Sequence, residues 1–69
     1  MRNIHRSILP TPMGNFLIDI DHEGQELLGF RIHPILWGVV LPPEPMQTYD
    51  QKEVALLEND IRGILKDNF

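Results

Sequence analysis

Asn15-Phe-Leu-Ile-Asp-Ile-Asp-His-Glu-Gly-Gln-Glu-Leu-Leu-Gly-Phe-Arg-Ile-His33 is the stretch of sequence that decides the fold. Apolar residues recur at every second position before Gly24 and again after it, which is the period of a strand with one buried face. The two apolar sets are Phe16, Ile18 and Ile20, and Leu28, Phe30 and Ile32. The sequence therefore predicts a central β-hairpin over residues 15–33.

The reversal of this hairpin is expected at residues 21–24. A type I turn there, with Gly24 in the left-handed region as a bulge residue, joins the two strands. That turn places Phe16 opposite Phe30 and Ile18 opposite Leu28, so that one face of the hairpin is wholly apolar. Cross-strand aromatic and branched pairs of this kind stabilise a sheet.

The segments on either side of the hairpin predict further strands. Pro34 is expected to end the second strand, because it lacks a backbone N–H. The run from Ile35 to Leu41 is apolar on both faces, which predicts a third strand over 35–41 that is covered on both sides. Residues 3–9 predict an edge strand, with a flexible arm over 1–12 as the alternative, because Pro10 and Pro12 interrupt regular pairing.

A C-terminal helix is expected from about residue 50 to 66. Asp50 is a good N-cap residue, and an apolar stripe follows at three- and four-residue spacing. The stripe consists of Val54, Leu57, Ile61, Ile64 and Leu65. We therefore predict a single-domain α+β fold, in which a small antiparallel sheet carries one helix on its Phe16/Ile18/Leu28/Phe30 face.

Length and composition narrow the function classes. The chain has 69 residues, no cysteine and a formal net charge of −4. Disulfides, thiolate zinc sites and a cysteine nucleophile are therefore excluded, and a reducing cytoplasmic location is expected. Arg2 and Arg6 are the only close basic pair, which disfavours direct nucleic-acid binding. The apolar run 35–41 is far shorter than the roughly 20 residues that span a bilayer, so no membrane association is expected.

The acidic residues before Gly24 resemble the start of a calcium loop. Asp19, Asp21 and Glu23 alternate as calcium ligands do, but the twelfth position, where a bidentate Glu is required, is Phe30. His5, His22 and His33 lie on separate segments without the spacing of a zinc site. No metal or cofactor is predicted, and binding of calcium, zinc or a small ligand at the acidic turn remains an alternative.

No catalytic arrangement is expected in this chain. Ser7 is the only serine, and no nucleophile elbow surrounds it. Paired carboxylates exist at Asp19 and Asp21, but so small a domain has little room for a substrate pocket of about 300 Å³. The sequence therefore predicts a protein that is not an enzyme.

The function predicted instead is protein–protein interaction. Trp37 and Tyr49 are large aromatic residues with polar tips, a type enriched at interfaces. Pro42, Pro43 and Pro45 form a stiff connector, and Asp21 and Glu23 provide an acidic rim. We predict a regulator, inhibitor or accessory subunit that also forms a homodimer, because a small core favours a second chain. The alternative is an acidic mimic that occupies a nucleic-acid-binding partner.

One family resemblance lies in the first half of the chain. Thr11-Pro-Met-Gly14, the strand Phe16–Ile20, Gly24 and the strand Leu27–Ile32 together resemble the opening hairpin of alkylguanine-DNA alkyltransferases. The activity of that family requires a reactive cysteine on a separate domain, and this chain has none. The resemblance therefore implies a hairpin and no function.

Overall fold

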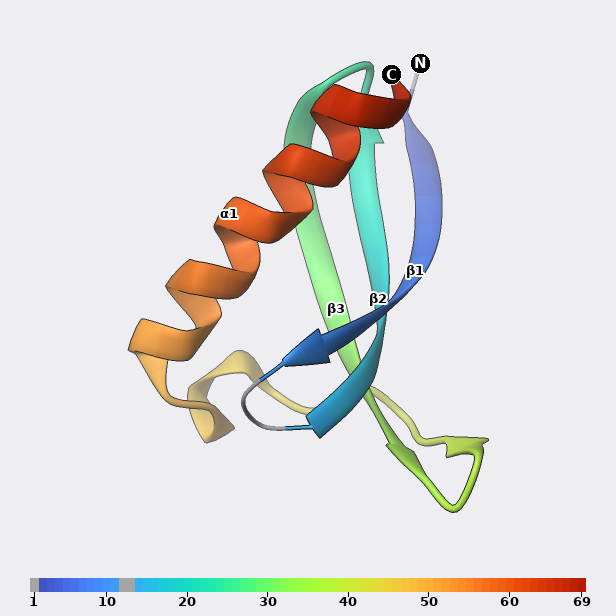
Figure 1. Ribbon diagram of the computed structural model, residues 1–69, viewed down its shortest axis with the longest axis vertical. Coiled ribbons are helices and arrows are strands. Elements are labelled where there is room, and N and C mark those ends of the chain that lie inside the picture. Colours follow the sequence, from blue (N-terminus) through green and yellow to red (C-terminus); the bar gives the residue numbers. More distant parts are fainter. Residues whose placement is uncertain (1, 12–13) are drawn as a thin grey trace.

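The structure is a curled antiparallel sheet with one helix packed on one face (Figure 1). It is a computed structural model that describes residues 2–11 and 14–69. The strands lie in the order β1-β2-β3-β4, with bounds β1 Asn3–Thr11, β2 Gly14–Glu23, β3 Glu26–Leu36 and β4 Val39–Val40. A short 3₁₀ turn, η1 (Met46–Thr48), precedes helix α1 (Gln51–Asn68). The predicted α+β class, the N-terminal edge strand and the C-terminal helix are confirmed, whereas Pro12 lies outside the described residues.

The β2–β3 hairpin pairs in a different register from the one predicted. Ile18 lies opposite Ile32, and Ile20 lies opposite Phe30. The predicted pairs, Phe16 with Phe30 and Ile18 with Leu28, are wrong because β2 continues to Glu23 and the chain reverses over only two residues. The first of these is Gly24, whose φ of 57° is the positive value that this position of a tight two-residue turn requires.

A β-bulge at Leu28 makes the apolar face of the hairpin differ from the predicted one. Asp21 pairs with Gly29 and His22 pairs with Leu27, so Leu28 has no partner opposite it. The extra residue interrupts the alternation between Leu27 and Phe30, so Leu27 packs against the core in place of Leu28. Leu28 is consequently 45% exposed, and it does not lie on the helix-covered face as predicted.

The segment 35–41 is a hairpin rather than one covered strand. β3 continues through Pro34 to Leu36, the chain turns at Trp37 and Gly38, and the two-residue strand β4 follows. The carbonyl of Pro34 accepts from the N–H of Leu41 at 2.8 Å, so the Pro34 ring nitrogen also faces away from β2. Proline therefore costs the β2–β3 ladder no hydrogen bond, and the expected strand break at Pro34 is wrong.

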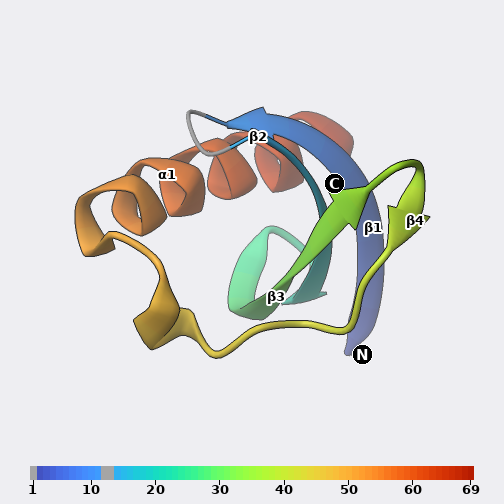
Figure 2. The same cartoon turned by 90° about the horizontal axis from the view of Figure 1, so that it is seen from below.

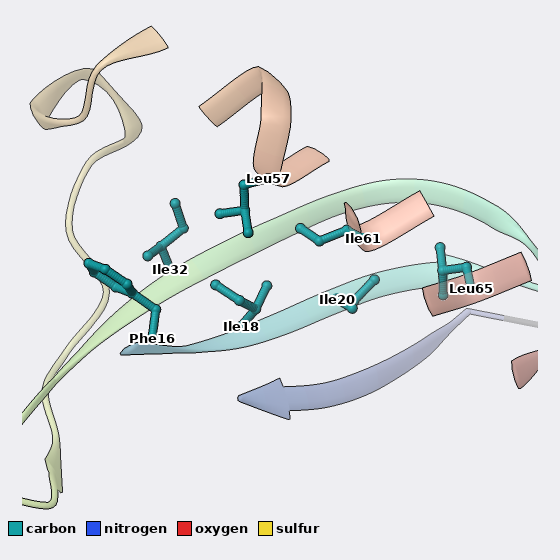
Figure 3. Close-up of a cluster of buried hydrophobic side chains, with 7 residues drawn as sticks. All are labelled: Phe16, Ile18, Ile20, Ile32, Leu57, Ile61 and Leu65. Carbon is teal, nitrogen blue, oxygen red and sulfur yellow. The ribbon is translucent and has the colours of Figure 1, made fainter. Parts of the chain in front are cut away.

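The hydrophobic core lies between the sheet and α1, as Figure 3 shows. Side chains from β2 and β3 meet the apolar stripe of the helix, as the alternating and helical spacings predict. The buried cluster consists of Phe16, Ile18, Ile20, Ile32, Leu57, Ile61 and Leu65. One side of the sheet is thus covered, and the other, which we call the outer face, has no helix over it (Figure 2).

Two features hold the helix in place. The Asp50 side chain caps its N-terminus by accepting from the N–H of Lys52 at 2.9 Å. At its other end the ring of Phe69 packs on His5 and on the buried His22, with ring centroids 5.5 and 4.4 Å away. Phe69 therefore lies beside the first part of β1, at one pole of the molecule (Figure 1).

Candidate functional site

The β3–β4 hairpin ends in an exposed apolar tip. We call residues 36–40 the hairpin tip; it consists of Leu36, Trp37, Gly38, Val39 and Val40. Trp37 is 93% exposed, and the three aliphatic side chains are each about half exposed. The tip projects on the side of the sheet away from α1 (Figures 1 and 2). A contiguous apolar protrusion of this kind is typical of a surface that contacts another molecule.

Trp37 also has an unfavourable backbone conformation. Its φ is 54° and that of Gly38 is 76°, so both central residues of the turn are in the left-handed region. A type I′ hairpin turn needs this conformation, which asparagine and glycine adopt most readily. For a bulky residue such a conformation costs on the order of 1–3 kcal/mol. With 93% of its surface exposed, Trp37 recovers almost none of that cost by packing within the chain.

The outer face carries charged side chains that pair across the strands. The Arg6 guanidinium bonds the Asp19 carboxylate, with Nε 2.7 Å from Oδ1, and the Arg2 guanidinium bonds Asp21 in the same way. His33 bridges two segments, because Nε2 lies 3.0 Å from Asp19 Oδ2 and Nδ1 lies 3.0 Å from the Leu41 carbonyl. We call these five residues, Arg2, Arg6, Asp19, Asp21 and His33, the charged ladder.

The ladder alters the acidity of its carboxyl groups. The hydrogen bond from Arg6 lowers the pKa of Asp19, and the charges of Arg6 and His33 act in the same direction. The hydrogen bond from Arg2 likewise lowers the pKa of Asp21. Both carboxylates are therefore ionised at neutral pH and neutralised by partners within the chain. These two Arg–Asp pairs consequently present little net charge to an approaching molecule.

A partly open cavity of about 430 Å³ lies on the outer face. It spans β1, β2 and β3 near the β2–β3 turn, where Ile4, Asp21 and Gly29 lie side by side in the sheet. Its walls combine apolar surface with two carboxylates and two guanidinium groups. The lining residues are Arg2, Ile4, Asp19, Asp21, Leu28, Gly29, Phe30 and Arg31.

Gly29 leaves space for the cavity, and Arg31 provides a charged group in its wall. A Cβ atom built on Gly29 meets no heavy atom within 4 Å, so the absent side chain leaves the hollow. Arg31 is exposed and forms no salt bridge or hydrogen bond within residues 2–11 and 14–69. Its charge helps to lower the pKa of Asp21, after the hydrogen bond and charge of Arg2, but no hydrogen bond holds its guanidinium, which can therefore contact a ligand.

The structure brings together only some of the predicted partner-binding residues. Trp37 lies at the hairpin tip, and Pro42, Pro43 and Pro45 are exposed on the connector that returns from it to the helix. Tyr49 packs edge-to-face on Phe16, with ring centroids 5.8 Å apart, and its hydroxyl is buried without a hydrogen-bond partner among the described residues. Burial and the nearby Glu44 raise the pKa of this hydroxyl.

The two predicted acidic residues lie at the other end of the sheet. Asp21 lines the cavity and is bonded to Arg2, and Glu23 is exposed beside the β2–β3 turn. Within the described part of the chain, no group of three or more His, Asp or Glu side chains is placed to hold a metal ion. None of the helices described is long and apolar enough to cross a membrane.

The cavity and the charged ladder were not predicted from the sequence. Arg2 and Arg6 alternate with Ile4 and Ile8 over residues 2–8, at the start of the chain and along β1, and this two-residue period is the signal that was available. Opposite charges at matching intervals on β1 and β2 would have predicted the Arg6–Asp19 pair. The contribution of Gly29 depends on the register of β3, which the bulge changes.

Comparisons of this chain with protein-family models, with characterised proteins and with solved structures return no match. The hairpin resemblance to alkylguanine-DNA alkyltransferases therefore gains no support from them.

Proposed function

We propose that this protein is a small non-catalytic interaction module that regulates or assists a larger partner through its hairpin tip. The observation that carries the proposal is the combination of exposure and strain at Trp37. A costly conformation at a side chain that is 93% exposed suggests a role outside the chain. Tryptophan is also the residue type most enriched among those that dominate binding energy at protein interfaces.

The surroundings of Trp37 suit an interface. Exposed aliphatic residues flank it, and the prolines of the connector begin two residues after Val40. Because proline restricts the backbone before binding, a partner that contacts this connector orders little additional chain. The apolar tip would supply the buried centre of the contact and the connector its rim.

Affinity capture from the native cell tests the proposal in two steps. The wild-type chain is used to capture partners, and the binding of each purified partner is then measured with W37N and with L56A. W37N preserves the turn, because asparagine suits its conformation. Leu56 is an exposed leucine on α1, far along the chain from the tip, and L56A serves as the matched control.

We expect a large increase in the Kd of the partner for W37N and none for L56A. A central interface tryptophan contributes about 2 kcal/mol or more, so W37N should weaken the partner's Kd by roughly 30-fold. L56A should leave the Kd unchanged. Equal binding by W37N and the wild type would contradict the proposal.

A further inference from the structure

We propose that the cavity on the outer face receives Trp37 of a second copy of this chain, so that two copies pair by exchanging hairpin tips. The proposal rests on the proposed function, because it names a partner for the same tip. It assigns a role to the cavity, which the interaction through Trp37 alone does not explain.

The cavity matches the chemistry of an indole ring. Ile4 and Leu28 offer apolar walls, and the guanidinium of Arg31 is free to stack on the face of an aromatic ring. The indole N–H needs an acceptor, and a carboxylate has about four lone-pair sites, more than the Arg2 bonds to Asp21 occupy. A volume of about 430 Å³ also leaves room for the aliphatic residues beside Trp37.

Tip and cavity lie at opposite ends of the same face. The cavity is at the pole where β1 begins and the β2–β3 turn lies, whereas the tip is at the opposite end of the longest axis (Figure 1). A two-fold axis that runs across the strands exchanges these ends. Two copies with their outer faces together therefore place each Trp37 over the cavity of the other, which gives a closed isologous dimer.

Charge favours a second copy on this face and not on the helix. The chain has a net charge of −4, and α1 with its N-cap residue carries five acidic and three basic side chains. Helix-to-helix approach of two copies would therefore bring like charges together. On the outer face the Asp19 and Asp21 carboxylates are neutralised by Arg6 and Arg2, and the tip carries no charge.

The outer face and the hairpin tip expose enough surface for a dimer interface of standard size. A standard interface buries about 800 Å² per partner, which is roughly a sixth of the 4805 Å² surface of the chain. The outer face offers exposed Ile4, Ile8 and Leu28 in addition to the tip. These residues lie around the charged ladder, so apolar contacts would surround the neutralised pairs.

Sedimentation equilibrium across a concentration series tests the pairing with three variants. W37N removes the tip's ring, and G29V fills the cavity at a position where a Cβ meets open space and φ is not positive. G63A, on the exposed side of α1, is the control. We expect the wild type and G63A to dimerise, and W37N and G29V to weaken the dimer at least tenfold.

Mixing W37N with G29V tests the exchange of hairpin tips more directly. W37N retains the cavity and G29V retains the tip, so one tip-to-cavity contact can form in a mixed pair. The mixture should therefore associate more strongly than either variant alone. No gain on mixing would contradict the exchange of tips.

Tryptophan fluorescence reports the same event directly. Trp37 is the only tryptophan, so its emission should shift to the blue as the wild type is concentrated, and should not shift in G29V. A wild type that stays monomeric at the highest concentration, or one that grows into species larger than dimers, overturns the pairing. If a monomeric wild type still binds a captured partner through Trp37, the proposed function stands while this inference fails.

Discussion

At the scale of single residues, Trp37 combines an unfavourable backbone conformation with a side chain that is 93% exposed. Its neighbours Leu36 and Val39 pair across a two-residue turn that favours asparagine followed by glycine. Gly38 meets that preference and Trp37 does not. The sequence therefore lacks the usual signal of this turn, and the segment 35–41 is predicted as one continuous strand. The same disagreement between residue and conformation is the reason for proposing Trp37 as a functional position.

The first prediction is that W37N stabilises the monomer by about 1 kcal/mol, because it relieves the strain at a site with few contacts to lose. Urea unfolding at low protein concentration measures the change. V39N is the control: Val39 is a strand residue without positive φ, so asparagine there should be neutral or destabilising. A less stable W37N monomer would show that Trp37 is not strained.

The second prediction concerns Asp19 of the charged ladder. Its pKa is lowered in the folded chain, so it adds stability that is present above its unfolded pKa of about 3.9 and is lost as pH falls through the lower folded value. D19N should cost about 1 kcal/mol at pH 7 and flatten the fall in stability below pH 4. E58Q, in an exposed helix pair with Arg62, should cost no more than about 0.5 kcal/mol at pH 7.

At the scale of elements, the faces of strands and helix were predictable, and their register was not. The alternation of Phe16, Ile18 and Ile20 identifies the buried face of β2, and the stripe on α1 identifies its partner. The bulge at Leu28 could not be predicted from the sequence around it, because a leucine is compatible with either face of β3. Which side the Pro34 nitrogen faces also depends on a neighbouring segment. Such features are decided by tertiary packing, and the cavity depends on all of them.

The third prediction tests the bulge. L28A should cost less than about 1 kcal/mol in the monomer, because Leu28 is 45% exposed on the outer face. I32A should cost about 2–5 kcal/mol, because Ile32 is fully buried against the helix. Thermal unfolding of both variants at one low concentration gives the comparison. Equal losses of stability in L28A and I32A would instead support the register predicted from the sequence, in which Leu28 lies in the core.

At the scale of the whole molecule, small size makes association energetically important. A chain of 69 residues is expected to have only a few kcal/mol of stability, so a partner that binds the folded state changes it substantially. The outer face leaves one side of the sheet without a covering layer (Figure 2). Stability and assembly should therefore be linked in this protein.

The fourth prediction is that the melting temperature of the wild type rises with protein concentration, because only folded chains can form the proposed dimer. The rise should be smaller for W37N, whose dimer is expected to be weaker, and G63A should behave as the wild type does. Calorimetry over a hundredfold concentration range measures this dependence. A constant Tm for the wild type would argue against a folded-state dimer.

The packing of Phe69 against His5 near the start of β1 has a practical consequence for engineering. His5 and Phe69 touch at one pole, and the hairpin tip occupies the other (Figure 1). A short linker between the ends would close the backbone into a ring and reduce the entropy of the unfolded chain without approaching Trp37. New ends opened in the exposed connector between Pro42 and Pro45 would then yield a circular permutant. The distance of the tip from His5 and Phe69 also suits display on a surface, with Trp37 directed outward.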